Sequence, residues 1–172
     1  MAEPGNLLHR ADLERSLLQD VAVVSEVAQR IGHAFAAGHG LHDTDFRALN
    51  FLHASELQGR RVTPAMLGAH LMLSSGAVTY LLDRLEAGGH VTRVRDPHDR
   101  RRVLLEYADA GRELAVAFFG PLARLHHDAL ASVSDDDLEA AHRVLAIVID
   151  GLRKHEGELR GQVRPRRKDL RA

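Results

Sequence analysis

The chain of 172 residues contains no cysteine and no tryptophan. Without cysteine it can have no disulfide framework, no thiolate metal site and no thiol-based redox sensor. Aromatic residues make up only 4% of the chain, whereas hydrophobic residues as a whole make up 45%. The core must therefore consist mostly of leucine, valine and alanine, and this composition favours packed helices over a β-sandwich.

Several patterns that carry known functions are also missing. No run of about 18 apolar residues is present, so no segment is expected to span a membrane. The first residues lack the basic and apolar regions of a signal peptide. The sequence has no Gly-x-Ser-x-Gly, P-loop or Gly-x-Gly-x-x-Gly motif, which argues against an enzyme. We therefore expect a cytoplasmic, non-enzymatic protein without a cofactor.

Charge is strongly segregated along the chain, although the formal net charge is only −1. Residues 60–102 contain eight arginines and four acidic residues, and residues 157–172 contain six basic and two acidic residues. The remainder has nine basic and eighteen acidic residues. A basic strip in an acidic protein favours binding to a polyanion. A chance fluctuation of surface charge is the alternative.

Apolar periodicity predicts a long helix over residues 11–36. Its stripe consists of Leu13, Leu17, Val21, Val24, Ala28, Ile31 and Phe35. This stripe has more apolar surface than a small domain covers by itself, so it favours packing against a second copy of the chain. A plain core helix is the alternative. A shorter helix is expected to begin at Asp43.

The next segment has the spacing of a helix-turn-helix motif. Thr63 and Pro64 predict a helix start, and Ser74 or Ser75 caps a second helix about three residues after the first one ends. The apolar positions of the second helix are Val78, Leu81, Leu82 and Leu85, spaced i, i+3, i+4 and i+7. Met72 occupies the turn where such motifs usually have glycine, so we expect a strained or altered turn there.

A charged hairpin follows over residues 91–105. Two β-type runs flank a turn formed by Asp96, Pro97, His98 and Asp99. The hairpin carries five arginines, namely Arg93, Arg95, Arg100, Arg101 and Arg102. Helical patterns then cover residues 109–156, and residues 157–172 are interpreted as a flexible basic tail.

The order of these elements resembles the MarR family of winged-helix transcriptional regulators over residues 10–155. The most specific motifs are Thr-x-x-x-Asp-Arg-Leu-Glu at 79–86 and Asp-x-x-Asp-Arg-Arg at 96–101. The resemblance implies a mainly α fold with a small β-hairpin wing in one domain over 1–172. The winged helix-turn-helix would cover 43–107, and dimerisation helices would cover 11–36 and 109–156. It also implies a homodimer that binds a pseudo-palindromic operator in double-stranded DNA, as a repressor released by a small aromatic or anionic effector.

The candidate DNA-binding residues lie on the second helix of the motif and on the hairpin. They are Ser74, Ser75, Gly76, Ala77, Thr79, Tyr80, Arg84, Arg95, Asp99, Arg100, Arg101 and Arg102. The resemblance implies that Arg101 enters the minor groove and that Asp99 orients it through a bidentate pair. Arg84 either contacts phosphate or pairs with Asp83 or Glu86. Similar proteins often have arginine at the position of Tyr80, so their base preference does not transfer.

Two further groups of residues have alternative interpretations. Val27, Ile31, Phe35 and Phe46 are candidates for an effector pocket, or they belong to the core. His39, His42, His126 and His127 raise the alternative of a zinc-responsive regulator, although no His-Glu-x-x-His or Cys/His framework is present. A protein-interaction module that has lost DNA binding is a further alternative, and the arginines of the hairpin argue against it.

Overall fold

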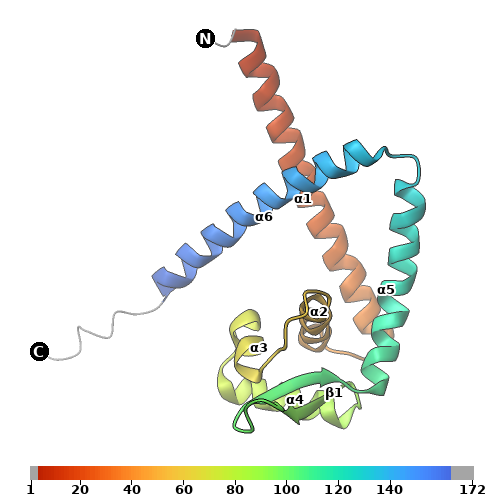
Figure 1. Cartoon of the computed structure of the whole chain (residues 1–172), viewed down its shortest axis with the longest axis vertical. Coiled ribbons are helices and arrows are strands. Elements are labelled where there is room, and N and C mark those ends of the chain that lie inside the picture. The colour runs from red at the N-terminus through yellow and green to blue at the C-terminus, as the bar shows by residue number, and fades with distance from the viewer. Residues whose placement is uncertain (1–3, 164–172) are drawn as a thin grey trace, which may run out of the picture. The chain divides into compact units, whose positions relative to one another are not determined.

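The computed structural model describes residues 4–163, and Figure 1 shows their arrangement into helices and one hairpin. The chain divides into two compact units, and the boundary lies between Leu122 and Ala123. The first unit contains α1 (Pro4–Gly38), α2 (Asp43–Leu57), α3 (Pro64–Leu71), α4 (Ser75–Ala87), β1 (Val91–Arg95), β2 (Val103–Tyr107) and the beginning of α5 (Asp109–Leu130). The second unit contains the end of α5 and α6 (Asp135–Val163). The mainly α winged helix-turn-helix fold is therefore confirmed.

The core of the first unit lies between α2, α3, α4 and the hairpin. The four apolar positions predicted for α4 are all buried, with Leu82 and Leu85 each 1% exposed. Burying a leucine side chain contributes roughly 1.5–3 kcal/mol to stability, so this face fixes α4 against the core. The opposite face of α4 remains available to solvent.

The hairpin is a two-stranded antiparallel sheet in which Val91 pairs with Tyr107 and Arg95 pairs with Val103. The amide of Leu105 donates to the carbonyl oxygen of Val62 at 2.8 Å. The buried hydroxyl of Tyr107 donates to the carbonyl oxygen of Leu49 on α2, and burial raises the pKa of this phenol. These contacts attach the base of the wing to α2 and to the loop before α3.

Local capping explains where the two helices of the motif begin and end. Thr63 Oγ1 accepts a hydrogen bond from the Met66 amide at 3.2 Å, and Pro64 occupies the first turn of α3. Met72 ends α3 in the left-handed conformation, with φ 57° and ψ 40°. The altered turn expected at Met72 is therefore present, because a residue with a Cβ atom occupies a conformation that favours glycine.

Replacing Met72 with glycine is expected to raise the free energy of unfolding by up to about 1 kcal/mol. The Met72 side chain is 78% exposed, so its removal loses little packing while it relieves the left-handed strain. Urea denaturation measures the change. The control is Gly59→Ala, which introduces the same strain at a φ of 64° with open space around the new Cβ atom. A shift of both variants in the same direction would contradict this account.

Two sequence expectations about the helices need correction. α1 begins at Pro4 rather than near Ala11, and α6 continues to Val163, so residues 157–163 are not a flexible tail. Gly157 and Gly161 weaken a helix by about 1 kcal/mol each. An i,i+4 ion pair of 2.7 Å between Glu156 and Arg160 supports the helix at this point. The rest of the predicted tail, residues 164–172, lies outside the described residues.

No single helix within residues 4–163 is long and apolar enough to cross a membrane. The two short helices α3 and α4 reach the length and apolar composition of a membrane span only when they are counted as one segment. Their axes bend by 110° relative to each other. This angle lies in the range of about 90–120° that helix-turn-helix motifs adopt.

Candidate nucleic-acid interface

The exposed face of α4 carries most of the residues predicted to contact DNA. Ser74, Ser75, Gly76, Thr79 and Tyr80 are all exposed, whereas Ala77 is half-buried. The amide of Ala77 donates to Ser74 Oγ at 3.3 Å, so Ser74 rather than Ser75 caps the helix. A Cβ atom added to Gly76 would meet nothing within 4 Å. The start of α4 thus offers small residues and amide groups at a helix N-terminus, an arrangement suited to phosphate.

Thr79 has only part of its hydrogen-bonding capacity available. Its hydroxyl donates to the carbonyl oxygen of Ser75 at 3.0 Å, within the same helix. The hydroxyl proton is therefore engaged, and the lone pairs and the methyl group remain. These can accept from a base amino group or contact a thymine methyl group.

Arg84 has a partner that the sequence did not indicate. Its Nε atom donates to both carboxylate oxygens of Asp45 on α2, at 3.1 and 3.0 Å, and Nη2 donates to the same carboxylate. Asp45 is 3% exposed, and hydrogen bonding to it raises the pKa of Arg84. Of the two alternatives for Arg84, pairing with Asp83 or Glu86 is wrong, and the guanidinium lies against α2.

Asp83 and Glu86 bind Arg93 instead, and this contact joins the wing to α4. The Arg93 guanidinium donates to Asp83 Oδ1 at 2.9 Å and to Glu86 Oε2 at 2.6 Å. The Arg93 amide donates to Glu86 Oε1 at 3.0 Å. Arg93 is half-buried, so β1 is fixed to the last two turns of α4 by a network and not by one surface pair.

The turn of the wing is organised around Asp96, a buried carboxylate. Its Oδ1 atom accepts the His98 amide at 2.9 Å, and Arg61 and Arg102 approach it at 3.6 and 4.0 Å. The hydrogen bond from His98 and the two arginine charges hold the pKa of Asp96 below its usual value. Asp96 therefore stays ionised at neutral pH and fixes the first half of the turn.

Asp99 organises the second half of the turn, but not through the expected bidentate pair. Its Oδ1 atom accepts the backbone amide of Arg101 at 3.0 Å, and its carbonyl oxygen accepts the Arg102 amide at 2.8 Å. No ion pair between Asp99 and Arg101 is present within the described chain. An aspartate often bonds the backbone two residues ahead in a turn. Asp99 consequently positions Arg101 through its main chain and leaves the guanidinium free.

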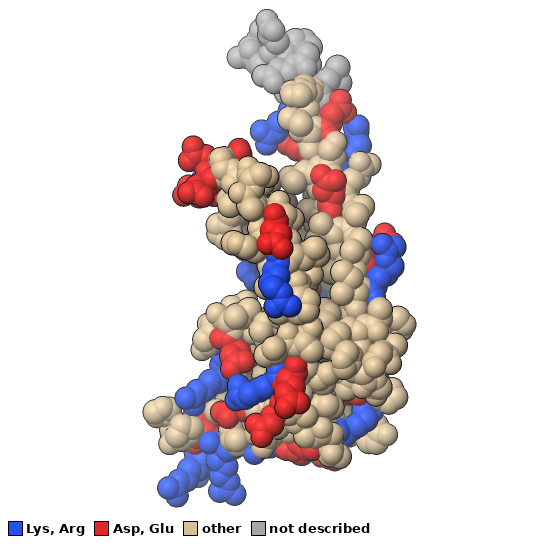
Figure 2. All heavy atoms as spheres, turned by 90° about the vertical axis from the view of Figure 1, so that its right-hand side faces the viewer, with Lys and Arg blue, Asp and Glu red and all other residues tan. Residues whose placement is uncertain are grey.

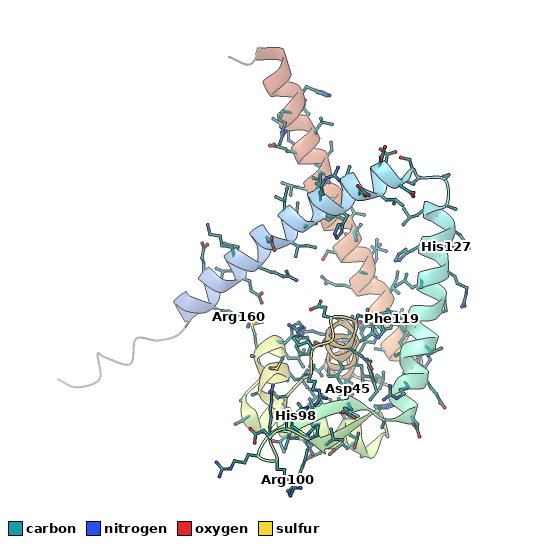
Figure 3. All side chains as sticks on the ribbon, in the orientation of Figure 1. Asp45, His98, Arg100, Phe119, His127 and Arg160 are labelled. Atoms are coloured by element: carbon teal, nitrogen blue, oxygen red, sulfur yellow. The ribbon has the colours of Figure 1, made fainter. Side chains whose placement is uncertain are left out.

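The arginines at the tip of the wing are directed outward. Arg95, Arg100, Arg101 and Arg102 are exposed, and Figure 3 shows Arg100 projecting from the turn. Figure 2 shows basic side chains gathered at the end of the first unit that carries the wing. The structure thus brings two predicted groups into the same unit, one on α4 and one on the wing. Sequence reasoning missed Asp45 as the partner of Arg84 and Arg93 as the link between the wing and α4.

The candidate effector residues fall partly within an aromatic cluster of α1, α2 and α5. The rings of Phe35 and Phe46 both lie 4.9 Å from the ring of Phe118, centroid to centroid. Val27 is half-buried, and Ile31 is 41% exposed. Phe35 and Phe46 are thus half-buried and in contact with Phe118, and they lie outside the buried core of the first unit.

Two of the four histidines considered as zinc ligands, His39 and His42, make other contacts, whereas His126 and His127 are exposed on α5. His39 Nδ1 lies 2.8 Å from the carbonyl oxygen of Phe35, and its ring stacks on the Phe35 ring. His42 precedes the first turn of α2, where its amide donates to Asp45 Oδ2 at 3.2 Å. Within residues 4–163, no three histidine, aspartate or glutamate residues are grouped so that they could hold a metal ion.

Comparison with known proteins agrees with this geometry. A sequence model described as MarR family matches residues 39–102, which include the helix-turn-helix and the wing turn. An uncharacterised HTH-type transcriptional regulator of Bacillus subtilis, YcgE, is 32% identical over 130 residues, covering 76% of this chain and 82% of its own length. This chain belongs to the MarR family. It is a transcriptional regulator and not an enzyme.

Solved structures of MarR-family proteins share the fold. A MarR family protein from Bacillus stearothermophilus is 26% identical, with a TM-score of 0.58 over 88% of this chain and 99% of that one. MepR from S. aureus in a complex with DNA is 18% identical, with a TM-score of 0.54 over 77% of this chain and 93% of that one. The second similarity concerns the fold alone.

Proposed function

We propose that this MarR-family chain is a cytoplasmic, homodimeric repressor that binds a pseudo-palindromic operator and is released by a small ligand. The observation that carries the proposal is the fixed arrangement of two exposed surfaces, the start of α4 and the arginine tip of the wing. α4 would enter the major groove and read base edges. The wing would lie along the adjacent minor groove, where guanidinium groups bind the electronegative floor.

Exposed apolar side chains on the long helices support the homodimer. α6 exposes Ile147, Leu152 and Leu159, α5 exposes Val116 and Leu125, and α1 exposes Leu13, Leu18, Val23 and Val24. A monomer seldom leaves this much apolar surface in water. A second copy of the chain would cover these faces, as the long first helix predicts.

The dimer is tested by Ile147→Glu, because Ile147 is 73% exposed in the single chain. Sedimentation velocity at micromolar concentration is expected to show a dimer for the parent chain and a monomer for the variant, since a buried, unpaired carboxylate opposes association. The control is Lys154→Glu, an exposed charged position on the same helix. A monomeric parent chain would contradict the proposed assembly.

DNA binding is tested by selecting duplexes from a random pool and then varying the salt. We expect an enriched palindrome whose half-sites are about one helical turn apart. Affinity for that operator should fall by about 10³-fold or more between 50 and 200 mM salt if six or more phosphates are contacted. A flat response to salt, measured by fluorescence anisotropy, would contradict the role of the arginines.

The proposal that a ligand releases the protein from DNA is based on a cavity of about 480 Å³ between α3, α4 and the wing. Pro64, Val78, Leu82 and Val103 line it with apolar surface, while Thr79 and Arg93 contribute polar groups. Such a lining suits a small aromatic acid. The site predicted at Val27, Ile31, Phe35 and Phe46 stays a prediction. Titrating aromatic carboxylates into the operator complex should release DNA and raise the melting temperature of the protein, and no shift with any of them would count against an effector of this class.

A further inference from the structure

Tyr80 is an exposed side chain whose ring contacts an arginine on the same helix. It is 69% exposed on the face of α4 opposite the core. The guanidinium carbon of Arg84, one helical turn further along, lies 5.3 Å from the centroid of its ring. A cation over an aromatic ring at this distance is attracted by the electron density of the ring. The contact restricts the rotation of a side chain that would otherwise move freely in water.

Arg84 can hold Tyr80 because Arg84 is itself fixed from the other side. Asp45, a residue of α2 labelled in Figure 3, accepts the hydrogen bonds of Arg84. Asp45 is also bound by the His42 amide at the start of α2. The guanidinium is thus held by a buried carboxylate, while its central carbon lies over the tyrosine ring. A chain of contacts leads from α2 to the exposed face of α4.

The contact leaves the Tyr80 hydroxyl with a free proton. A guanidinium has only hydrogen-bond donors, so Arg84 cannot accept the proton of the phenol. The neighbouring Thr79 differs, because its hydroxyl proton is bound to Ser75. Tyr80 therefore presents a hydrogen-bond donor on the surface that would face the base edges.

We propose that Asp45 and Arg84 are positioning residues, which hold Tyr80 so that its hydroxyl donates to an acceptor on one base edge in each half-site. Tyr80 would then select that base pair. Its side chain would already be ordered in the free protein, before DNA binds. The inference rests on the proposed function, since it requires α4 to lie in the major groove. A side chain that is ordered in advance loses less freedom when it binds.

The positioning part is tested first on the free protein. The chain has two tyrosines, Tyr80 and Tyr107, so fluorotyrosine labelling gives two ¹⁹F resonances, and the Tyr80→Phe variant identifies the Tyr80 signal by its loss. Arg84→Lys is expected to shift and narrow the Tyr80 signal while the Tyr107 signal stays in place. Asp45→Asn should act in the same way. The matched control is Arg47→Lys on α2, because Arg47 is exposed and makes no hydrogen bond or ion pair within residues 4–163. An unchanged Tyr80 signal in both folded variants would overturn the proposal.

The base-selecting part is tested by repeating the duplex selection with the variants. Tyr80→Phe should reduce the preference for one base pair per half-site by about fivefold. Arg84→Lys keeps the charge, so a phosphate contact would survive, yet we expect the same loss at the same base pair. The double variant should lose no more than Tyr80→Phe alone. Losses that multiply, or an equal loss for every sequence, would overturn the proposal.

The NMR measurement on the free protein and the duplex selection together separate this inference from the proposed function. A parent chain that binds no duplex refutes the proposed function and the base selection, whereas the NMR result on the free protein still decides whether Asp45 and Arg84 order Tyr80. A parent chain that binds its operator while Tyr80→Phe keeps the full preference refutes the inference alone.

Discussion

Arg101→Ala is expected to weaken operator binding by about 10- to 100-fold, which corresponds to roughly 1–3 kcal/mol. Arg101 is exposed at the tip of the wing, and Asp99 holds its backbone in place. The guanidinium makes no ion pair with the rest of the described chain, so its removal should leave the melting temperature and the dimer unchanged. Fluorescence anisotropy at constant salt measures the affinity.

Two further variants separate the position of Arg101 from its charge. Arg101→Lys keeps the charge but should recover only part of the affinity, because the lysine ammonium is more strongly hydrated and fits a narrow groove less well. Arg124→Ala removes an exposed arginine of α5 and should change the affinity by less than about twofold, since surface charges away from a contact contribute little. An equal loss for Arg101→Ala and Arg124→Ala would contradict the role assigned to the wing.

Gly111→Ala is expected to lower the free energy of unfolding by about 3 kcal/mol or more. Gly111 is buried in the first turn of α5, and a Cβ atom there would lie 2.0 Å from the carbonyl oxygen of His90 and 2.8 Å from Tyr107 Cδ1. The carbonyl oxygen belongs to the backbone directly before β1 and cannot rotate away. Either α5 shifts relative to the hairpin, or the core opens.

The control for Gly111 is Gly157→Ala in α6, where a new Cβ atom would meet nothing within 4 Å. That variant should gain about 0.5–1 kcal/mol from improved helix propensity. Chemical denaturation of both variants gives the comparison. A Gly111→Ala variant as stable as the parent chain would show that His90 and α5 are not packed as described.

The local elements of the candidate DNA-binding surface, which consists of the exposed face of α4 and the wing, could be predicted from short patterns in the sequence. The caps at Thr63 and Ser74, the buried face of α4 and the turn at residues 96–99 each depend on neighbours within a few positions. Helix capping, 3.6-residue periodicity and turn chemistry act over this range. The two motifs that indicate the family, at 79–86 and 96–101, lie in α4 and in this turn.

The contacts between elements that support the candidate DNA-binding surface could not be predicted in this way. Arg84 and Asp45 are 39 residues apart, and nothing in the helical pattern of α2 distinguishes Asp45 from the exposed Asp43. The sequence places Arg93 in the hairpin and does not reveal that its side chain contacts α4. Ion pairs between elements depend on tertiary packing, and a single sequence does not reveal which of several nearby carboxylates an arginine will reach.

The link through Arg93 has a consequence for the spacing of bases in the operator. Because β1 and α4 are joined by hydrogen bonds of 2.6–3.0 Å, the strand that leads into the tip of the wing is fixed against the second half of α4. In the proposed complex with DNA, this link sets the interval between the bases that α4 contacts and the flanking minor-groove step that the wing contacts. One base pair inserted into that interval would move the flank by about 3.4 Å and rotate it around the duplex. The regulator would then reject a sequence in which every individually contacted base is still correct.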